Sequence, residues 1–154
     1  FLEAFAVPGK PPLYLERDDG DHTAAGLGSH CLGVKITNPS SGATLVHLPA
    51  CAAIDDELRR RVRGADVLFF DGTLFTDDEL IELGVSEKTG KRMGHVSMSG
   101  SEGSMAAFAD LDIRRRVYIH INTTNPVLVA GSAQRRQIEK AGWEVAYDGM
   151  EVSL

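Results

Sequence analysis

Apolar and polar positions divide the chain into a strand-rich first part and a second part in which helical and strand periods alternate. Residues 31–37 and 43–48 each have the composition of a strand, and the turn-forming residues 38–42 join them into a predicted hairpin. Residues 1–30 are interrupted by proline and glycine, and there we expect irregular structure around one short strand at 13–16.

Beyond the hairpin the apolar positions take up a helical spacing. Ile54, Leu58 and Val62 recur every four residues, which predicts a helix over residues 55–63 with one apolar face. The continuous apolar run at 67–70 is typical of a strand that is covered on both faces.

A capping box is expected next in the chain. Thr76 and Glu79 have the spacing at which a hydroxyl and a carboxylate satisfy the free amides of a helix start, and Leu80, Ile81 and Leu83 are expected on the buried side of that helix.

The remaining pattern completes an α/β class. Residues 84–100 lack a clear period, and so long a connection is usually functional or disordered. A short helix at 101–109, a strand at 117–122, a helix at 132–141 and a last strand at 143–147 complete the pattern. Alternation of this kind predicts a layered sheet with helices on its faces.

Charge and composition narrow the function classes. The chain has 154 residues and a net charge of −6, and no apolar run approaches the length of a membrane span. An integral membrane protein and a general nucleic-acid-binding surface are therefore disfavoured. The arginine runs at 59–61 and 114–116 are interpreted as solvated ends of elements, with a phosphate-binding patch as the less favoured alternative.

The cysteines indicate a cellular compartment, and the start of the chain indicates how much of the protein the sequence covers. Cys31 and Cys51 fit no zinc spacing or disulfide framework, so we expect two idle thiols in a reducing, cytoplasmic compartment. The chain opens on Phe1 without a signal-peptide pattern, and we expect it to be a piece of a longer protein.

Three side chains are candidates for metal chemistry. Asp71 closes the strand at 67–70, His120 lies near the end of the strand at 117–122, and His95 lies in the glycine-rich segment. Because sites in α/β sheets gather beyond the carboxyl ends of strands, these groups are placed to hold a first-row transition metal.

Each candidate also has a structural alternative. Asp71 can be a turn residue before a glycine, His120 a hydrogen-bonded histidine on a polar sheet face, and His95 an exposed loop histidine. The other histidines, His22, His30 and His47, lack supporting context and are interpreted as structural. Asn122, Asn125 and Pro126 are interpreted as residues that shape the turn after His120.

Three ordered segments resemble the pyrroloquinoline quinone biosynthesis protein B family. They are residues 70–80 (FDGTLFTDDEL), residues 93–100 (MGHVSMSG) and residues 118–126 (YIHINTTNP). The opening residues 5–11 and the closing segments 142–145 and 148–151 are also similar to that family, so the resemblance covers nearly the whole chain.

The resemblance implies the fold and the extent of the domain. Members of the family have the metallo-β-lactamase-like αββα sandwich, made of two similar halves. Residues 1–154 resemble the C-terminal portion of this single domain, with the N-terminal half and its main histidine–aspartate ligand cluster absent. The resemblance to the second half of this fold implies Asp71 and His120 as metal ligands. His95 resembles a histidine that acts as an acid–base or stabilising group beside the metal in related nucleases.

The resemblance also implies a function. The family acts in making pyrroloquinoline quinone, and we expect an iron-dependent enzyme that uses molecular oxygen to hydroxylate the tyrosine ring of a Glu-Tyr-derived precursor. Iron is favoured over zinc because zinc offers no redox chemistry. The alternatives are a soluble carrier that assists transport of the cofactor or its precursor to the periplasm and, less favoured, a metal-dependent hydrolase. Other proteins of the same pathway are possible partners.

Overall fold

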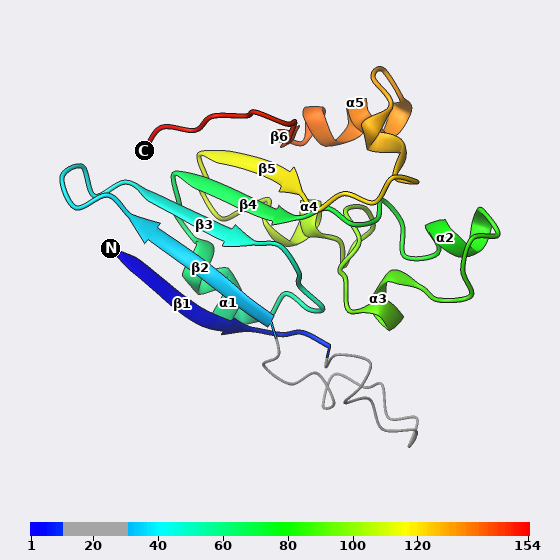
Figure 1. Ribbon diagram of the computed structural model, residues 1–154, viewed down its shortest axis with the longest axis horizontal. Helices are drawn as coiled ribbons and strands as arrows, with labels where there is room; N and C mark the ends of the chain where they lie inside the picture. Colours follow the sequence, from blue (N-terminus) through cyan, green and yellow to red (C-terminus); the bar gives the residue numbers. More distant parts are fainter. Residues whose placement is uncertain (11–30) are drawn as a thin grey trace.

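The computed structural model describes residues 1–10 and 31–154, and within them a mixed six-stranded sheet forms the centre of the molecule (Figure 1). The strands lie side by side in chain order, and they are β1 (Leu2–Val7), β2 (Cys31–Thr37), β3 (Thr44–Leu48), β4 (Val67–Asp71), β5 (Arg115–Ile119) and β6 (Trp143–Val145). The expected strand at 13–16, together with His22 and His30, lies outside the described residues.

The sheet changes from antiparallel to parallel pairing at β3. Strands β1, β2 and β3 pair antiparallel, whereas β3, β4, β5 and β6 pair parallel. The helical elements of the second part are α1 (Asp56–Val62), α2 (Glu79–Glu82), α3 (Gly90–Met93), α4 (Ser104–Ala107), the 3₁₀ turn η3 (Pro126–Leu128) and α5 (Ala133–Lys140). The predicted α/β class with a mixed sheet and helices on its faces is confirmed.

The main core lies between one face of the sheet and the helices. Leu58 and Val62 of α1, Phe108 after α4 and Ile138 of α5 are buried against strand residues of β3, β4, β5 and β6. Aromatic rings fill the middle of this core. Phe70 meets Phe108 edge to face at 4.9 Å between ring centroids. These contacts bury large apolar surfaces, which is the main favourable term in folding.

Residues on the opposite face of the sheet are also apolar. Leu45, Val67 and Val117 are buried, although alternation along their strands points them away from the main core. The C-terminal segment runs from β6 back toward the β2–β3 turn (Figure 1). There the Asn38 side-chain amide donates to the carbonyl oxygen of Leu154 at 3.1 Å.

The first predicted element needs correction, because part of the supposedly irregular segment 1–30 is a regular strand. Strand β1 pairs with β2 along its whole length, and its Phe5 and Val7 side chains enter the core. Only Glu3 is polar in Leu2–Val7, so the alternation of buried and exposed positions is invisible in the sequence.

The predicted capping box at Thr76 is also wrong. Helix α2 begins at Glu79 with Asp78 as its N-cap, and that N-cap makes no side-chain hydrogen bond. Of the residues expected on the buried side of this helix, Leu80 is buried, whereas Ile81 and Leu83 are exposed. With only four residues, α2 is too short to present a helical stripe to the core.

Other boundaries shift by a few residues. The unpatterned segment 84–100 contains α3, and the helix expected at 101–109 is the single turn α4. Strand β5 ends at Ile119, so His120 comes after the strand instead of lying within it. None of the helices in the described part of the chain is long and apolar enough to cross a membrane.

The aromatic core gives a stability prediction. Phe108→Ala removes a fully buried ring and its edge-to-face contact with Phe70, so we expect the free energy of unfolding to fall by about 3–5 kcal/mol. Chemical denaturation measures this loss. Ile81→Ala, at a position that is 43% exposed, is the control and should change stability by about 0.5 kcal/mol or less. Equal losses in the two variants would contradict the assignment of Phe108 to the core.

Candidate metal centre

Asp71 occupies the end of the central strand β4. Its side chain has no exposed surface, which is unusual for a carboxylate and requires that its charge be met by donors. Gly72 comes next, and a Cβ atom there would lie 2.8 Å from the Met98 side chain and 3.0 Å from Tyr118 Cβ. Glycine therefore lets the chain leave the strand in contact with β5, where the Gly72 amide donates to the Ile119 carbonyl at 2.8 Å.

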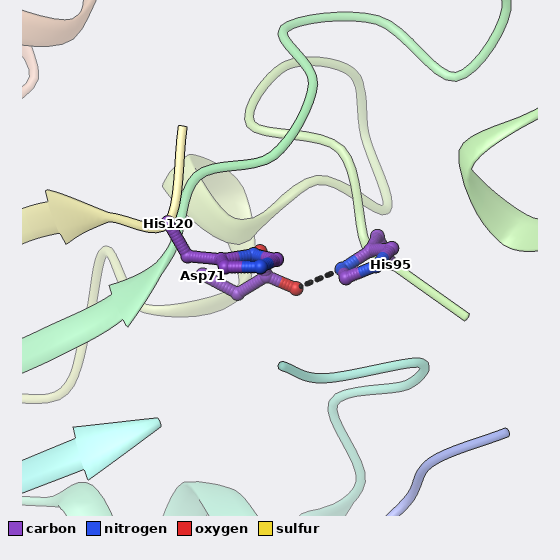
Figure 2. Close-up of side chains that lie close together, drawn as sticks. All are labelled: Asp71, His95 and His120. Atoms are coloured by element: carbon purple, nitrogen blue, oxygen red, sulfur yellow. Dashed lines mark hydrogen bonds and ion pairs between the residues drawn. The ribbon is translucent and has the colours of Figure 1, made fainter. Parts of the chain in front are cut away.

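His95 reaches the carboxylate from the loop after α3. Gly94 ends that helix with φ of 90°, in the left-handed region that favours glycine. On the other side of His95, Val96 is fixed because its amide donates to the Cys51 carbonyl at 2.8 Å. His95 Nδ1 then lies 2.6 Å from Asp71 Oδ2 (Figure 2).

His120 reaches the same carboxylate from the end of β5. Parallel pairing sets Ile119 beside Asp71, so the residue after the strand emerges next to the carboxylate. The backbone of His120 is left-handed, with φ of 51°, a conformation uncommon for a residue other than glycine. Its Nδ1 lies 3.4 Å from Asp71 Oδ1, and its ring stacks on that of His95 with 5.4 Å between centroids.

A hydroxyl lies at the junction of these three side chains. Thr73 Oγ1 is 2.6 Å from Asp71 Oδ1, 3.1 Å from His95 Nδ1 and 2.9 Å from His120 Nδ1. The Thr73 amide also donates to Asp71 Oδ1 at 3.1 Å, which closes a local Asx turn. The sequence patterns do not single out Thr73 as a site residue, although Asp-Gly-Thr at a strand end is a signal for such a turn.

A second buried carboxylate joins the two loops after β4 and β5. Glu79 Oε2 accepts the Phe75 amide at 2.8 Å, and Oε1 accepts the Thr124 hydroxyl at 2.8 Å. Asn125 adds a further link, since its side-chain amide donates to the Gly72 carbonyl at 3.1 Å. The loops after β4 and β5 are thus held to each other by hydrogen bonds. Asn125 also has the turn-shaping role that the sequence indicates, because its Oδ1 accepts the Val127 amide at 3.1 Å.

Opposing effects set the protonation states. Burial alone would raise the pKa of Asp71, but hydrogen bonds from His120, His95 and Thr73 outweigh it, so this pKa lies below its ordinary value. The hydrogen bond with Asp71 raises the pKa of His120, although partial burial opposes that rise. The centre therefore favours a carboxylate anion next to an imidazole that readily accepts a proton.

The structure brings together the three residues singled out in the sequence. One potential ligand atom from each of Asp71, His95 and His120 lies within 4.8 Å of the others, and these are the side chains drawn in Figure 2. His47 is not part of the group; it lies on β3 against the ring of Phe69. Two imidazoles and a carboxylate are donors that suit a first-row transition metal, so the residues present fit such an ion.

The cysteines lie near the centre as free thiols. Cys51 is buried, and its amide donates to Asp71 Oδ2 at 3.1 Å. Burial raises the pKa of both the Cys51 and Cys31 thiols, with a further contribution from the Asp71 charge. A raised pKa keeps these thiols protonated, so their reactivity is low.

A cleft of about 690 Å³ borders the segment that follows Cys51 and the segment that follows His95. Ala52 and Ala53 line it directly after Cys51, and Val96 and Ser97 line it directly after His95. The cations at its edge are already paired. Arg59 binds Asp110 at 2.9 Å, and Lys91 binds Glu102 at 2.9 Å, so the described residues that line the cleft do not present a free positive patch.

A profile of the Beta-lactamase superfamily domain matches residues 2–121 of this sequence. The chain belongs to the beta-lactamase superfamily. A likeness to the metallo-beta-lactamase fold protein YhfI from Bacillus subtilis agrees in fold alone, at 15% identity and a TM-score of 0.54 over 78% of this chain and 43% of that one.

Relatives within this superfamily confirm the resemblance seen in the sequence. The chain is 53% identical over 99% of its length to coenzyme PQQ synthesis protein B of Xanthomonas campestris pv. campestris, and 50% identical to the protein of that name from Gluconacetobacter diazotrophicus. It is also similar to the protein in the crystal structure of Zn²⁺-bound PqqB from Methylobacterium extorquens. The two chains are 43% identical with a TM-score of 0.89, and the match covers 99% of this chain and 50% of that chain. The chain spans about half the length of these relatives.

The coupling between Asp71 and His120 gives a pH prediction. In metal-free protein, Asp71→Asn removes the carboxylate that raises the pKa of His120, so we expect this pKa to fall toward its ordinary value of 6.5. While Asp71 is ionised, the pair stabilises the fold fully below pH about 6.5, and this stabilisation is lost as pH rises through the raised His120 pKa. It is also lost in acid, as pH falls through the lowered Asp71 pKa.

An NMR titration of the histidine ring protons measures the change. His47 is the internal control, because burial and not a carboxylate lowers its pKa, and its titration should stay the same in both proteins. A His120 titration that is unaffected by Asp71→Asn would show that the two side chains are not in contact.

Proposed function

We propose that this protein takes part in the biosynthesis of pyrroloquinoline quinone as a metal-dependent oxygenase. The observation that carries the proposal is the cluster of Asp71, His95 and His120 at the carboxyl ends of β4 and β5, in a chain 53% identical to a coenzyme PQQ synthesis protein B. A cluster of this composition next to a cleft is the ordinary arrangement of a metal-assisted active site.

A second proposal concerns the extent of the domain, and it rests on the length of the relatives and on the apolar outer face of the sheet. We propose that residues 1–154 form the C-terminal portion of one αββα sandwich, of which the N-terminal half supplies further metal ligands. Half-length coverage of the relatives supports this, as does the apolar outer face of the sheet. That face includes Leu32 and Ile36, which are exposed in this chain, beside the buried Leu45 and Val67. Apolar sheet surface of this kind favours a packing partner.

Each residue of the centre has a proposed part in the reaction. Asp71 and His120 are the proposed metal ligands, which supply a carboxylate oxygen and an imidazole nitrogen. His95, held at Nδ1, is placed to move a proton at its other ring nitrogen. Its side chain is 17% exposed, so bulk water has limited access to that proton.

Iron is the proposed metal, with molecular oxygen as co-substrate. Bound ferrous iron would supply the one-electron chemistry that oxygen activation needs, whereas zinc supplies only Lewis acidity. The proposed step converts a ring C–H bond of the tyrosine in a Glu-Tyr-derived precursor to C–OH. The second oxygen atom leaves as water, which consumes two protons and two electrons from an added reductant.

A cellular location and a set of partners belong to the same proposal. The two cysteines are free and are too few for a disulfide framework, which supports a reducing, cytoplasmic location. Other proteins of the pathway are proposed partners, because a small oxidisable precursor must be delivered to the centre and its product passed on.

The deciding experiment uses the complete protein reconstituted with Fe²⁺ or Zn²⁺. We expect oxygen-dependent hydroxylation of a Glu-Tyr substrate with iron and a reductant, detected by mass spectrometry, and none with zinc. His95→Ala should lower turnover by about 10²–10⁴-fold with metal retained, as expected for loss of an acid–base group. His120→Ala should lower metal content as well.

His47→Ala is the matched control, because it removes a histidine from the same sheet outside the cluster. It should retain metal and turnover. Tight precursor binding without turnover under any of these conditions would favour the soluble carrier, and hydrolysis with zinc alone would favour the hydrolase. Either result would overturn the oxygenase.

A further inference from the structure

The cleft beside the candidate metal centre has the size of a small-molecule site. Its volume of about 690 Å³ lies within the range of about 300–1,000 Å³ that is usual for ligand pockets. Its walls come from α1 and α3 and from the loops after β3, β4 and α3. Asp71, His95 and His120 do not line it, so the cleft and the centre are neighbours with separate linings.

Backbone hydrogen bonds hold the walls of the cleft in place. The Ser99 amide donates to the Phe75 carbonyl at 3.0 Å, and the Val96 amide donates to the Cys51 carbonyl at 2.8 Å. A Cβ atom at Gly103 would overlap the Ser99 carbonyl oxygen, so the loop before α4 is wound as tightly as glycine permits. The cleft is therefore formed before a ligand binds, which lowers the entropic cost of binding.

Asp77 gives this lining a carboxylate with one oxygen unused. Its Oδ1 accepts the Lys91 amide at 2.7 Å, and its carbonyl oxygen accepts the Gly90 amide at 2.8 Å, so the residue is fixed against the start of α3. Among the described residues, no donor binds Oδ2 and no cation forms an ion pair with the carboxylate. The Lys91 ammonium is bound to Glu102 instead.

Hydroxyl groups of the lining add further acceptors. Ser97 Oγ donates to the Ser99 carbonyl at 3.1 Å, and Ser99 Oγ donates to the Phe75 carbonyl at 2.7 Å. A serine hydroxyl has one hydrogen and two lone pairs, so both groups keep acceptor capacity and have no hydrogen left for a ligand. Ile54 and Val96 supply the larger apolar side chains of the lining.

We propose that this cleft binds the primary ammonium group of a small amine or amino acid, with Asp77 as the counter-ion. An ammonium group carries a positive charge and three hydrogens to donate, which suits a lining of acceptors around a carboxylate. The cations at the edge of the cleft already have carboxylate partners, so an anionic ligand would have to displace them. Ile54 and Val96 are placed to contact an apolar or aromatic body. Such a site lies beyond the proposed reaction, because the reaction uses none of its residues and binding requires no metal.

Four ligands that share a para-hydroxyphenyl body test which charge the cleft selects. Tyramine is a cation, L-tyrosine a zwitterion, N-acetyl-L-tyrosine an anion, and N-acetyltyramine is uncharged. In a ¹H–¹⁵N NMR titration of the complete protein without added metal, the dissociation constant of tyramine should be at least about tenfold lower than that of N-acetyltyramine, as expected for charge-assisted hydrogen bonds. L-Tyrosine should bind within a few-fold of tyramine. Tightest binding of N-acetyl-L-tyrosine, equal binding of the two amines, or no saturable binding of tyramine would overturn the proposal.

Asp77→Asn tests the assigned counter-ion. Asparagine keeps a side-chain oxygen for the Lys91 amide but carries no charge, so the tyramine dissociation constant should rise about tenfold. Asp78→Asn is the matched control, because it removes the same charge from a neighbour that does not line the cleft and makes no side-chain cap hydrogen bond. Equal weakening by the two substitutions would show that Asp77 has no direct contact with the ligand.

Lys91→Met has the opposite predicted sign. This substitution removes a cation from the lining and frees Glu102, while it keeps the backbone amide that binds Asp77. Tyramine should therefore bind a few-fold more tightly, a small effect because the lost charge is exposed to solvent. Weaker binding of tyramine to this variant would contradict a cation site.

The positions of the shifted amide signals locate the ligand. Tyramine should shift the amides of Ser97, Ser99 and Gly100, which line the cleft, and shifts centred on another part of the protein would rule the cleft out. If the oxygenase assay fails while tyramine binds here, the proposed reaction is wrong and the ammonium site stands. If the enzyme is active and tyramine does not bind, the reaction stands and the site is wrong. Should Asp77→Asn fail to fold, the four ligands and Lys91→Met still decide.

Discussion

The candidate metal centre depends on the burial of one negative charge, that of the Asp71 carboxylate. Removing a carboxylate from water is strongly unfavourable unless hydrogen-bond donors replace the lost solvent. Around Asp71 those donors come from four parts of the chain: the segment after β3, the turn after β4, the loop after α3 and the end of β5. The positions of these segments are therefore coupled through a single side chain.

Parallel pairing explains why these segments meet. Strands β3, β4 and β5 run in the same direction, so the segments at their carboxyl ends emerge at the same edge of the sheet. Cys51 comes after β3, Thr73 after β4 and His120 after β5. Loop 94–96 is bound to the same edge, because the Val96 amide donates to the Cys51 carbonyl. The Glu79 carboxylate links the loops after β4 and β5. Backbone topology supplies the approximate geometry, and side-chain hydrogen bonds refine it.

The separate contributions of backbone topology and side-chain hydrogen bonds explain how much could be predicted from the sequence. The α/β class, most strands and the gathering of Asp71, His95 and His120 are predictable from local periodicity, strand-end placement and family resemblance. Thr73 and Glu79 could not be assigned, because their roles depend on partners distant in sequence. The Thr76–Glu79 spacing satisfies a local capping rule, yet the Glu79 carboxylate makes long-range contacts instead. Strand β1 could not be predicted from hydrophobic periodicity, because its buried and exposed positions are almost all apolar.

The wide sequence spacing of the donors to Asp71 has a consequence for folding. The amide of Cys51, the ring of His95 and the ring of His120 lie 20, 24 and 49 residues from Asp71 along the chain. No hairpin or single helix–strand unit contains all of them, so a partly folded chain would have to leave the carboxylate solvated. We therefore expect the centre to form late in folding and to open together with the parallel half of the sheet. Exchange of the Cys51 amide hydrogen with solvent is then expected to report on the integrity of that half as a whole.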